Sequence, residues 1–242
     1  MQQKLAGYPI RVRGDLDPAL SRWKWLIKWV LAIPHFVVLF FLAIAYSIVT
    51  MVAFFAVLCT ARYPRTLFEF NVGVMRWAWR VSFYSFVLGT DKYPPFSLST
   101  DSDYPADLEV DYPERLNRGL VLIKSWLLAI PHYLIIAAVG SEAAHMLSAT
   151  DYGDWVNATA ISLLTILIAT AEISLLFIGR YPIGIFEFTI GLNRWIWRVQ
   201  TYAALMCDEY PPFRLDQGAR EPVCVMREIE AAEPTAAERG NK

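Results

Sequence analysis

Cysteine, histidine and the common catalytic motifs are scarce in this sequence of 242 residues. It holds three cysteines and three histidines, and no two cysteines stand in a CxxC spacing, which argues against a zinc ribbon or a disulfide framework. There is no nucleophile elbow, phosphate-binding loop or HExxH pair. No tract of clustered Lys and Arg resembles those that bind nucleic acid. The sequence therefore predicts a protein that is not an enzyme, holds no metal and has no nucleic-acid partner.

Charge is also missing from two long segments. Residues 29–61 contain no Lys, Arg, Asp or Glu, and the apolar run 158–179 is interrupted only by Glu172. The hydrocarbon core of a bilayer is about 30 Å thick and requires roughly 20 apolar residues in a helix. Both segments reach that length, and the mean hydropathy of the chain is +0.35. These features predict an integral membrane protein.

The chain contains an internal repeat. Residues 62–84 and 180–202 agree at 13 of 23 positions without a gap, LAIPH occurs twice, and DKYPPFSL is matched later by DEYPPFRL. Such repetition predicts two copies of one structural unit. The chain then divides into a first membrane repeat, an acidic cytoplasmic connector, a second membrane repeat and a polar C-terminal tail. These parts are residues 1–98, 99–111, 112–215 and 216–242.

The two repeats differ in length at one place. The second repeat has an additional polar stretch near residues 141–157, and an insertion enters a loop more readily than a helix. We therefore expect a turn at the equivalent place in the first repeat, near Ala45–Ser47, with a single strongly tilted helix as the alternative. The predicted fold is an all-α integral membrane protein with two tandem repeats. Each repeat is a transmembrane helical hairpin followed by an amphipathic interfacial helix, which makes about four transmembrane helices.

Positive charge flanks the apolar segments on one side. Lys and Arg are frequent before residue 29, after the first apolar segment and before the second, whereas the stretch 141–157 has none. Cytoplasmic flanks of membrane spans are enriched in these residues. The pattern predicts a multi-pass protein of the inner (plasma) membrane with both termini in the cytoplasm. The helices expected at 66–89 and 183–206 would then lie in the interface without crossing the bilayer.

A charged stripe interrupts each copy of that otherwise apolar helix. One face of the helix carries a glutamate, a glycine and two arginines. They are Glu69, Gly73, Arg76 and Arg80 in the first repeat and Glu187, Gly191, Arg194 and Arg198 in the second. A charge at the bilayer centre costs about 2.5–3.5 kcal/mol, so these groups need partners. Three roles stay open: packing, with the glutamate of one repeat paired to arginines of the other; a substrate, ion or proton path; and binding of lipid phosphate.

Three further side chains are candidates for function. His35 and His132 each follow the proline of LAIPH, where they could ligate haem b as a pair or bond a carbonyl freed by the proline. Glu172 is a candidate intramembrane acid for a proton or cation, or a polar group that reaches the bundle interior. No cofactor is expected, with haem b as the alternative.

The order LAIPH, then RYP…FEF…G…RW.WRV..Y, then D.YPPF.L, resembles an uncharacterised bacterial membrane-protein family, domain of unknown function 4389, in two tandem copies. The resemblance extends over both repeats up to about Leu215, and the phrase from RYP to YPPF is its most specific part. It implies a multi-pass inner-membrane protein and supplies no activity and no catalytic residues.

Four spans without a visible substrate site predict an accessory or scaffold subunit of a membrane complex. Its interfacial helices would bind lipid or partner helices, and its partners would be membrane lipids, other membrane subunits or a second copy of the chain. One alternative is a small transporter or channel that uses the Glu/Arg stripes. The second alternative is a haem-binding electron-transfer subunit that uses His35 and His132.

Overall fold

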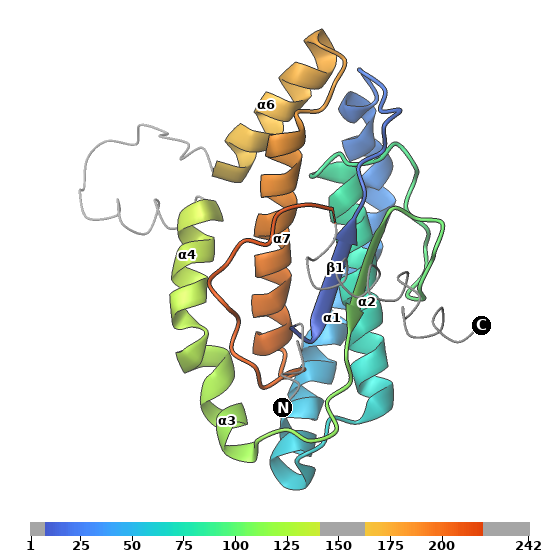
Figure 1. Cartoon of the computed structure of the whole chain (residues 1–242). Helices are drawn as coiled ribbons and strands as arrows, with labels where there is room; N and C mark the ends of the chain where they lie inside the picture. Colours follow the sequence, from blue (N-terminus) through green and yellow to red (C-terminus); the bar gives the residue numbers. More distant parts are fainter. Residues whose placement is uncertain (1–7, 141–162, 220–242) are drawn as a thin grey trace, which may run out of the picture.

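Helices dominate the structure, and one small sheet accompanies them (Figure 1). The computed structural model describes residues 8–140 and 163–219. In chain order the elements are β1 (Ile10–Gly14), α1 (Trp25–Thr60), α2 (Arg65–Ser85), β2 (Ala106–Val110), α3 (Arg118–Ile123), the π-helix η1 (Lys124–Leu128), α4 (Ile130–Gly140), α6 (Leu163–Phe177) and α7 (Ile183–Ala203). The predicted outer loop at 141–157 and most of the predicted tail fall outside the described residues.

The apolar segment of the first repeat forms one continuous helix, α1. The predicted hairpin with a turn near Ala45–Ser47 is therefore wrong, and the alternative of a single helix is correct. No glycine or proline follows Pro34 within the helix, and the Ser47 hydroxyl donates to the carbonyl of Ala43 at 2.9 Å, so nothing in the backbone forces a turn.

Its 36 residues make a rod of about 54 Å. Within the described ranges, α1 is the one helix whose length and composition would allow it to cross a membrane. The structure is thus mostly helical with one candidate span, and four transmembrane helices are not shown by it.

A two-stranded antiparallel sheet contradicts the all-α prediction. Strands β1 and β2 pair with Ile10 opposite Val110 and Gly14 opposite Ala106. The sequences IRVRG and ADLEV alternate apolar and polar residues, a pattern typical of a strand with one buried face. The signal is weak in the sequence because both stretches are only five residues long. Strand β2 lies within the predicted acidic connector, which is therefore part of the folded core.

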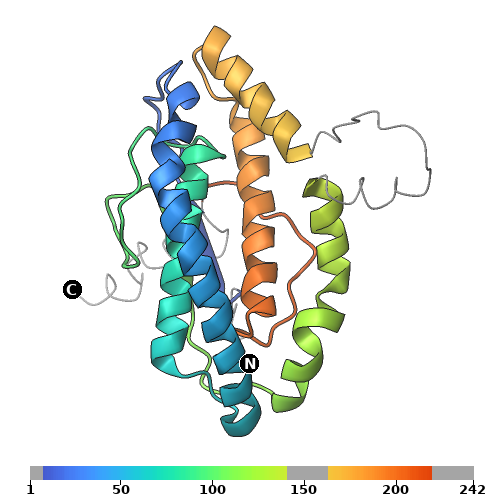
Figure 2. The ribbon, with the colours of Figure 1, turned by 180° about the vertical axis from the view of Figure 1, so that it is seen from behind.

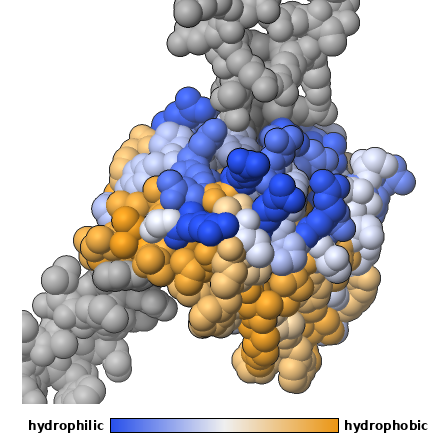
Figure 3. All heavy atoms as spheres, turned by 90° about the horizontal axis from the view of Figure 1, so that it is seen from below, coloured by the Kyte–Doolittle hydropathy of each residue, from blue (hydrophilic) through white to orange (hydrophobic). Residues whose placement is uncertain are grey.

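The elements form layers. Helix α2 packs along α1, β2 packs against α2, and β1 packs against α7. Figure 2 shows α1 on the back of the molecule, whereas the sheet lies on the front in Figure 1. Figure 3, a view from below, shows hydrophilic residues gathered on one side and hydrophobic residues on the opposite side. Large exposed apolar side chains follow α1 from end to end, including Leu26, Val30, Phe41, Ile48 and Phe55.

Each strand lies against the helix of the other repeat. Strand β1 precedes α1 but packs on α7, and β2 precedes α3 but packs on α2. The tyrosines before the strands follow the same rule. The Tyr104 hydroxyl donates to the carbonyl of Lys92 in the first repeat at 3.3 Å, and the Tyr8 hydroxyl donates to that of Glu209 in the second at 3.0 Å. The two repeats are joined by exchanged strands.

Candidate functional site

The arginines of the first stripe share one carboxylate on the neighbouring strand. Arg76 Nε lies 3.0 Å from Asp107 Oδ1, and Arg80 Nη2 lies 3.2 Å from the same oxygen. Arg76 also donates to the carbonyl of Leu98, and Arg80 to that of Ser99, both at 2.9 Å. The Arg80 side chain has no exposed surface. The two cations therefore share one counter-charge and are further stabilised by backbone carbonyls on the sheet side of α2.

The second stripe uses the same design with a different carboxylate. Arg198 pairs with Asp216, which follows the YPPF segment of the second repeat. Arg194 donates to the carbonyls of Val12 in β1, at 3.1 Å, and of Gly218, at 3.0 Å. Both arginine side chains are fully buried. Contacts with a carboxylate or with backbone carbonyls offset the burial of these charges, because an uncompensated buried charge costs several kcal/mol.

The predicted pairing between glutamates and arginines of the two repeats is wrong. Glu69 is exposed and Glu187 is half-buried, and neither forms an ion pair within residues 8–140 and 163–219. The carboxylates that do the pairing are Asp107 and Asp216. Their proximity to the arginines depends on chain segments that pack back onto the helices, so helical spacing does not predict it. Contacts between each stripe and the other repeat are made instead by the strands, through Asp107 in β2 and the Val12 carbonyl in β1.

The glycine of each stripe allows a chain segment to approach the helix closely. A Cβ atom at Gly73 would lie 2.9 Å from Leu98 Cβ and 3.1 Å from the Leu98 carbonyl oxygen, whereas at Gly191 the nearest atoms, in Leu215 and Asp216, are 3.5 Å away. The segment after YPPF thus crosses the helix at the glycine and presents its carbonyls to the arginines.

We expect Gly73→Ala to destabilise the protein, because the rigid Leu98 backbone leaves no room for the methyl group. Overpacking of this kind costs about 1–3 kcal/mol, which exceeds the gain of about 1 kcal/mol in helix propensity. Gly184→Ala is the matched control, since a Cβ at Gly184 in α7 meets no atom within 4 Å. Thermal unfolding in detergent should show a lower melting temperature for Gly73→Ala only. Equal effects of both substitutions would contradict the proposed contact.

The two histidines lie in equivalent aromatic cages. His35 stacks on Phe96 with ring centroids 3.9 Å apart, and its Nδ1 accepts a hydrogen bond of 3.1 Å from Trp77 Nε1. His132 stacks on Phe213 at 4.3 Å and contacts Trp195. Each cage therefore joins LAIPH to the YPPF segment of its own repeat. The aromatic partners of His35 and His132 have no residue in common, and the haem hypothesis remains a prediction that a Soret band would test.

Two buried lysines form a second pair of equivalent sites, which the sequence-based predictions did not include. Lys28 Nζ lies 2.9 Å from Asp91, and Lys124 Nζ lies 2.8 Å from Asp208. Both aspartates open the D.YPPF.L motif. The sequence does contain a signal for these pairs. In both repeats a lysine precedes LAIPH in an apolar helix, and the same acid begins the D.YPPF.L motif.

The π-helix η1 keeps this second lysine in position. Lys28 stands three residues before Leu31, but Lys124 stands four residues before Leu128 in the matching motif. In a regular helix the additional residue would rotate the lysine by about 100° relative to LAIPH. The π-helix spans Lys124–Leu128 and absorbs the additional residue, so that Lys124 still reaches Asp208 and His132 still enters its cage.

The carboxylate of Asp91 is stabilised in its ionised form. Burial alone would raise its pKa, but the contact with Lys28 and the hydrogen bond from the Ser21 backbone N–H outweigh burial and lower the pKa below its ordinary value. The Ser21 nitrogen lies 2.8 Å from the carboxylate. Lys28 therefore keeps its counter-charge at neutral pH.

Glu172 is half-buried on α6, and no basic side chain pairs with it among the residues that the structure describes. Its role as an intramembrane acid remains a prediction. The described residues also contain no group of three or more His, Cys, Asp or Glu that could hold a metal ion. The arginines of the two stripes are instead engaged in holding segments of the fold together.

The protein is mostly helical and is made of two copies of one unit. Each copy has a LAIPH cage, a buried Lys–Asp pair and a stripe helix that is covered by the strand of the other copy. The chain belongs to the family described as Domain of unknown function (DUF4389), which matches residues 22–97 and 156–214. The two matched segments confirm the resemblance noted in the sequence. Neither curated proteins nor solved structures contain a match to this chain. Both strands of the sheet lie outside the matched segments.

Proposed function

We propose that the protein is a membrane-bound scaffold without catalytic activity, inserted through its α1 face, with the sheet face in water for a partner. The observation that supports this proposal most strongly is that an apolar surface and a charged surface lie on opposite sides of the molecule. Apolar side chains are exposed along the whole of α1, whereas the sheet on the other side exposes the ion pairs of Arg11 with Glu109 and Asp111. An apolar surface of this extent marks a membrane or protein interaction site.

The layering favours a helix that lies in the plane of the membrane. Helices α1 and α2 run side by side in opposite directions: Lys28 contacts Thr90 beyond the end of α2, and Thr50 contacts Asn71 near its start. The sheet contacts α2 near mid-length, where Arg76 binds Leu108. If α1 crossed the bilayer, the exposed charges of the sheet would lie at bilayer depth, which costs several kcal/mol. With α1 in the plane, the sheet stays in water.

The multi-pass arrangement with about four spans and both termini in the cytoplasm is the competing arrangement. A helix of about 54 Å must tilt strongly to fit a hydrocarbon core of about 30 Å, whereas an in-plane helix has no such limit. The transporter hypothesis is less well supported than the scaffold, because the arginines that would line a path are bound to carboxylates and carbonyls on the sheet side.

Nitroxide labels along one line of α1 test the orientation. Val30, Phe41 and Val52 are spaced by 11 residues, which brings them to the same side of the helix, and they are 62%, 64% and 51% exposed. Each is replaced by a labelled cysteine in a background without the three native cysteines. Accessibility to oxygen and to a water-soluble nickel chelate gives the depth of each label in vesicles. A label at Glu109 is the water-exposed control.

The proposal expects three similar depths and a Glu109 label in water. A spanning α1 would place the outer two labels about 33 Å apart along the helix, with Phe41 deepest and the others near opposite headgroup layers. That result would reject the in-plane arrangement.

The scaffold role is tested separately by affinity purification in mild detergent. A partner should be lost from the charge-reversed variant Arg11→Glu and retained by Ile48→Ala on the apolar face.

A further inference from the structure

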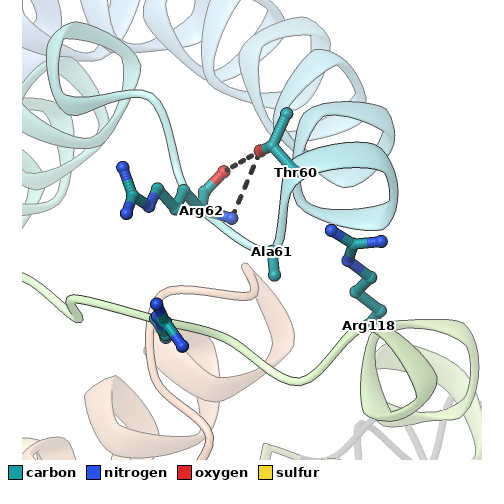
Figure 4. Close-up of a pocket in the computed structure, with 5 residues that line it drawn as sticks. Thr60, Ala61, Arg62 and Arg118 are labelled. Atoms are coloured by element: carbon teal, nitrogen blue, oxygen red, sulfur yellow. Dashed lines mark hydrogen bonds between the residues drawn. The ribbon is translucent and has the colours of Figure 1, made fainter.

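A pocket with three arginines lies where α1 ends (Figure 4). Ala61 adopts a left-handed backbone, with φ of 57°, which terminates the helix and turns the chain. The backbone N–H of Leu116 donates to the carbonyl of Ala61 at 2.9 Å, so the segment before α3 is held against this turn. Thr60, Ala61, Arg62, Arg115 and Arg118 line a cavity of about 440 Å³. Figure 4 shows Arg62 and Arg118 on either side of Ala61.

These arginines differ from those of the stripes in their lack of counter-charge. All three are exposed, and none of them pairs with a carboxylate in the described part of the chain. Exposed arginines gathered without acids are suited to an anionic ligand, because the guanidinium group donates two parallel hydrogen bonds to phosphate oxygens.

A second, mostly apolar groove lies further along α1 and α3, where α4 and the end of α7 also contribute to its lining. It has a volume of about 500 Å³, and its lining includes Tyr46, Phe54, Leu122, Tyr133 and Leu205. On α3, Leu122 of the groove lies about one helical turn after Arg118 of the pocket. On α1, Phe54 of the groove lies six residues before Thr60 of the pocket. Groove and pocket together thus offer an elongated apolar site with positive charge at one end.

We infer that this site binds one anionic phospholipid, with its phosphate headgroup on Arg62, Arg115 and Arg118 and an acyl chain in the groove between α1 and α3. The charge at one end and the apolar lining at the other match the two parts of such a lipid. A volume of this size is typical of ligand sites. The inference rests on the proposed membrane insertion, since a lipid enters the groove from the bilayer.

Binding of phosphatidylglycerol to the purified full-length chain in detergent, followed by native mass spectrometry, tests the site. The variant with Arg62→Gln, Arg115→Gln and Arg118→Gln should bind it at least about tenfold more weakly. The charge-matched control replaces Arg22, Lys24 and Lys92, exposed cations near the other end of α1, with Gln. Ser47→Trp, which fills the groove, should weaken binding similarly, whereas Ile48→Trp, on the next residue outside it, should not. Melting temperatures confirm that each variant is folded.

Several outcomes would overturn the inference. Equal losses in the arginine variant and its charge-matched control would indicate unspecific attraction. If phosphatidylcholine bound as tightly as phosphatidylglycerol, the negative charge of the lipid would not determine binding. Competition by inorganic phosphate, with no effect of Ser47→Trp, would identify a site for free phosphate. The measurement is made in detergent and does not depend on the orientation of α1, so a spanning α1 combined with arginine-dependent lipid binding would reject the in-plane arrangement alone.

Discussion

Replacing Asp107 with Asn should lower the free energy of unfolding by about 3–5 kcal/mol, the cost of leaving a buried charge without its partner. Arg76 and Arg80 share this single carboxylate, and the Arg80 side chain is fully buried. The substitution keeps the size of the side chain and removes only its charge. Denaturant unfolding in mild detergent, monitored by tryptophan fluorescence, measures the loss.

Glu109→Gln is the matched control. Glu109 lies two residues further along the same strand, and its pair with Arg11 is exposed, at 52% and 36% of the side-chain surfaces. Exposed pairs contribute about 0–1 kcal/mol, so the control should change little. Similar losses in the two variants would show that the strand, and not the shared charge, sets the effect. Substituting Arg76 and Arg80 with Met and Asp107 with Leu should recover part of the stability, because no buried charge is then left unpaired; the carbonyls of Leu98 and Ser99, which lose their donors, limit the recovery.

A chain that ends at residue 98 should fail to accumulate in a folded form. It retains α1 and α2 but lacks β2, so Arg76 and Arg80 lose Asp107 and the carbonyls that follow Leu98. Expression level and resistance to proteolysis in membranes measure the outcome. The two matched segments of the family would by themselves suggest that each repeat folds alone, which is the opposite expectation.

Co-expression with residues 99–242 is the control for this truncation. The cut falls between α2 and β2, between the two residues whose carbonyls bind Arg76 and Arg80, and the second fragment supplies the missing strand. Recovery of a folded complex from the two fragments would support exchanged strands. A first fragment that is stable alone would show that the stripe on α2 finds other partners.

The sequence predicted the helices well where repetition and hydropathy agreed. The duplicated helix and its charged stripe both followed from residue type and helical spacing. The hairpin in the first repeat was wrong because the insertion in the second repeat does not require a turn in the first. Helix α1 continues through Ala45–Ser47 with ordinary hydrogen bonds.

The partners of the charges could not be predicted from helical spacing. Asp107, Asp91 and Asp208 each lie in a segment that returns to a helix from outside it. Local periodicity carries no information on such contacts, which depend on tertiary packing. One signal was present and unused: the repeats have a lysine before LAIPH and an aspartate before YPPF at corresponding places. Two charges repeated together in an apolar setting are good candidates for a pair.

The exchanged strands bear on the origin of the chain. A protein with a single copy of this unit would have its stripe of arginines facing a position that its own strand does not fill. It could complete the fold by receiving the strand of a second identical chain, and giving its own in return, as a two-fold homodimer. Fusion of the two copies would make that exchange intramolecular and independent of protein concentration. It would also free the halves to diverge, so that Asp107 serves one stripe and Asp216 the other.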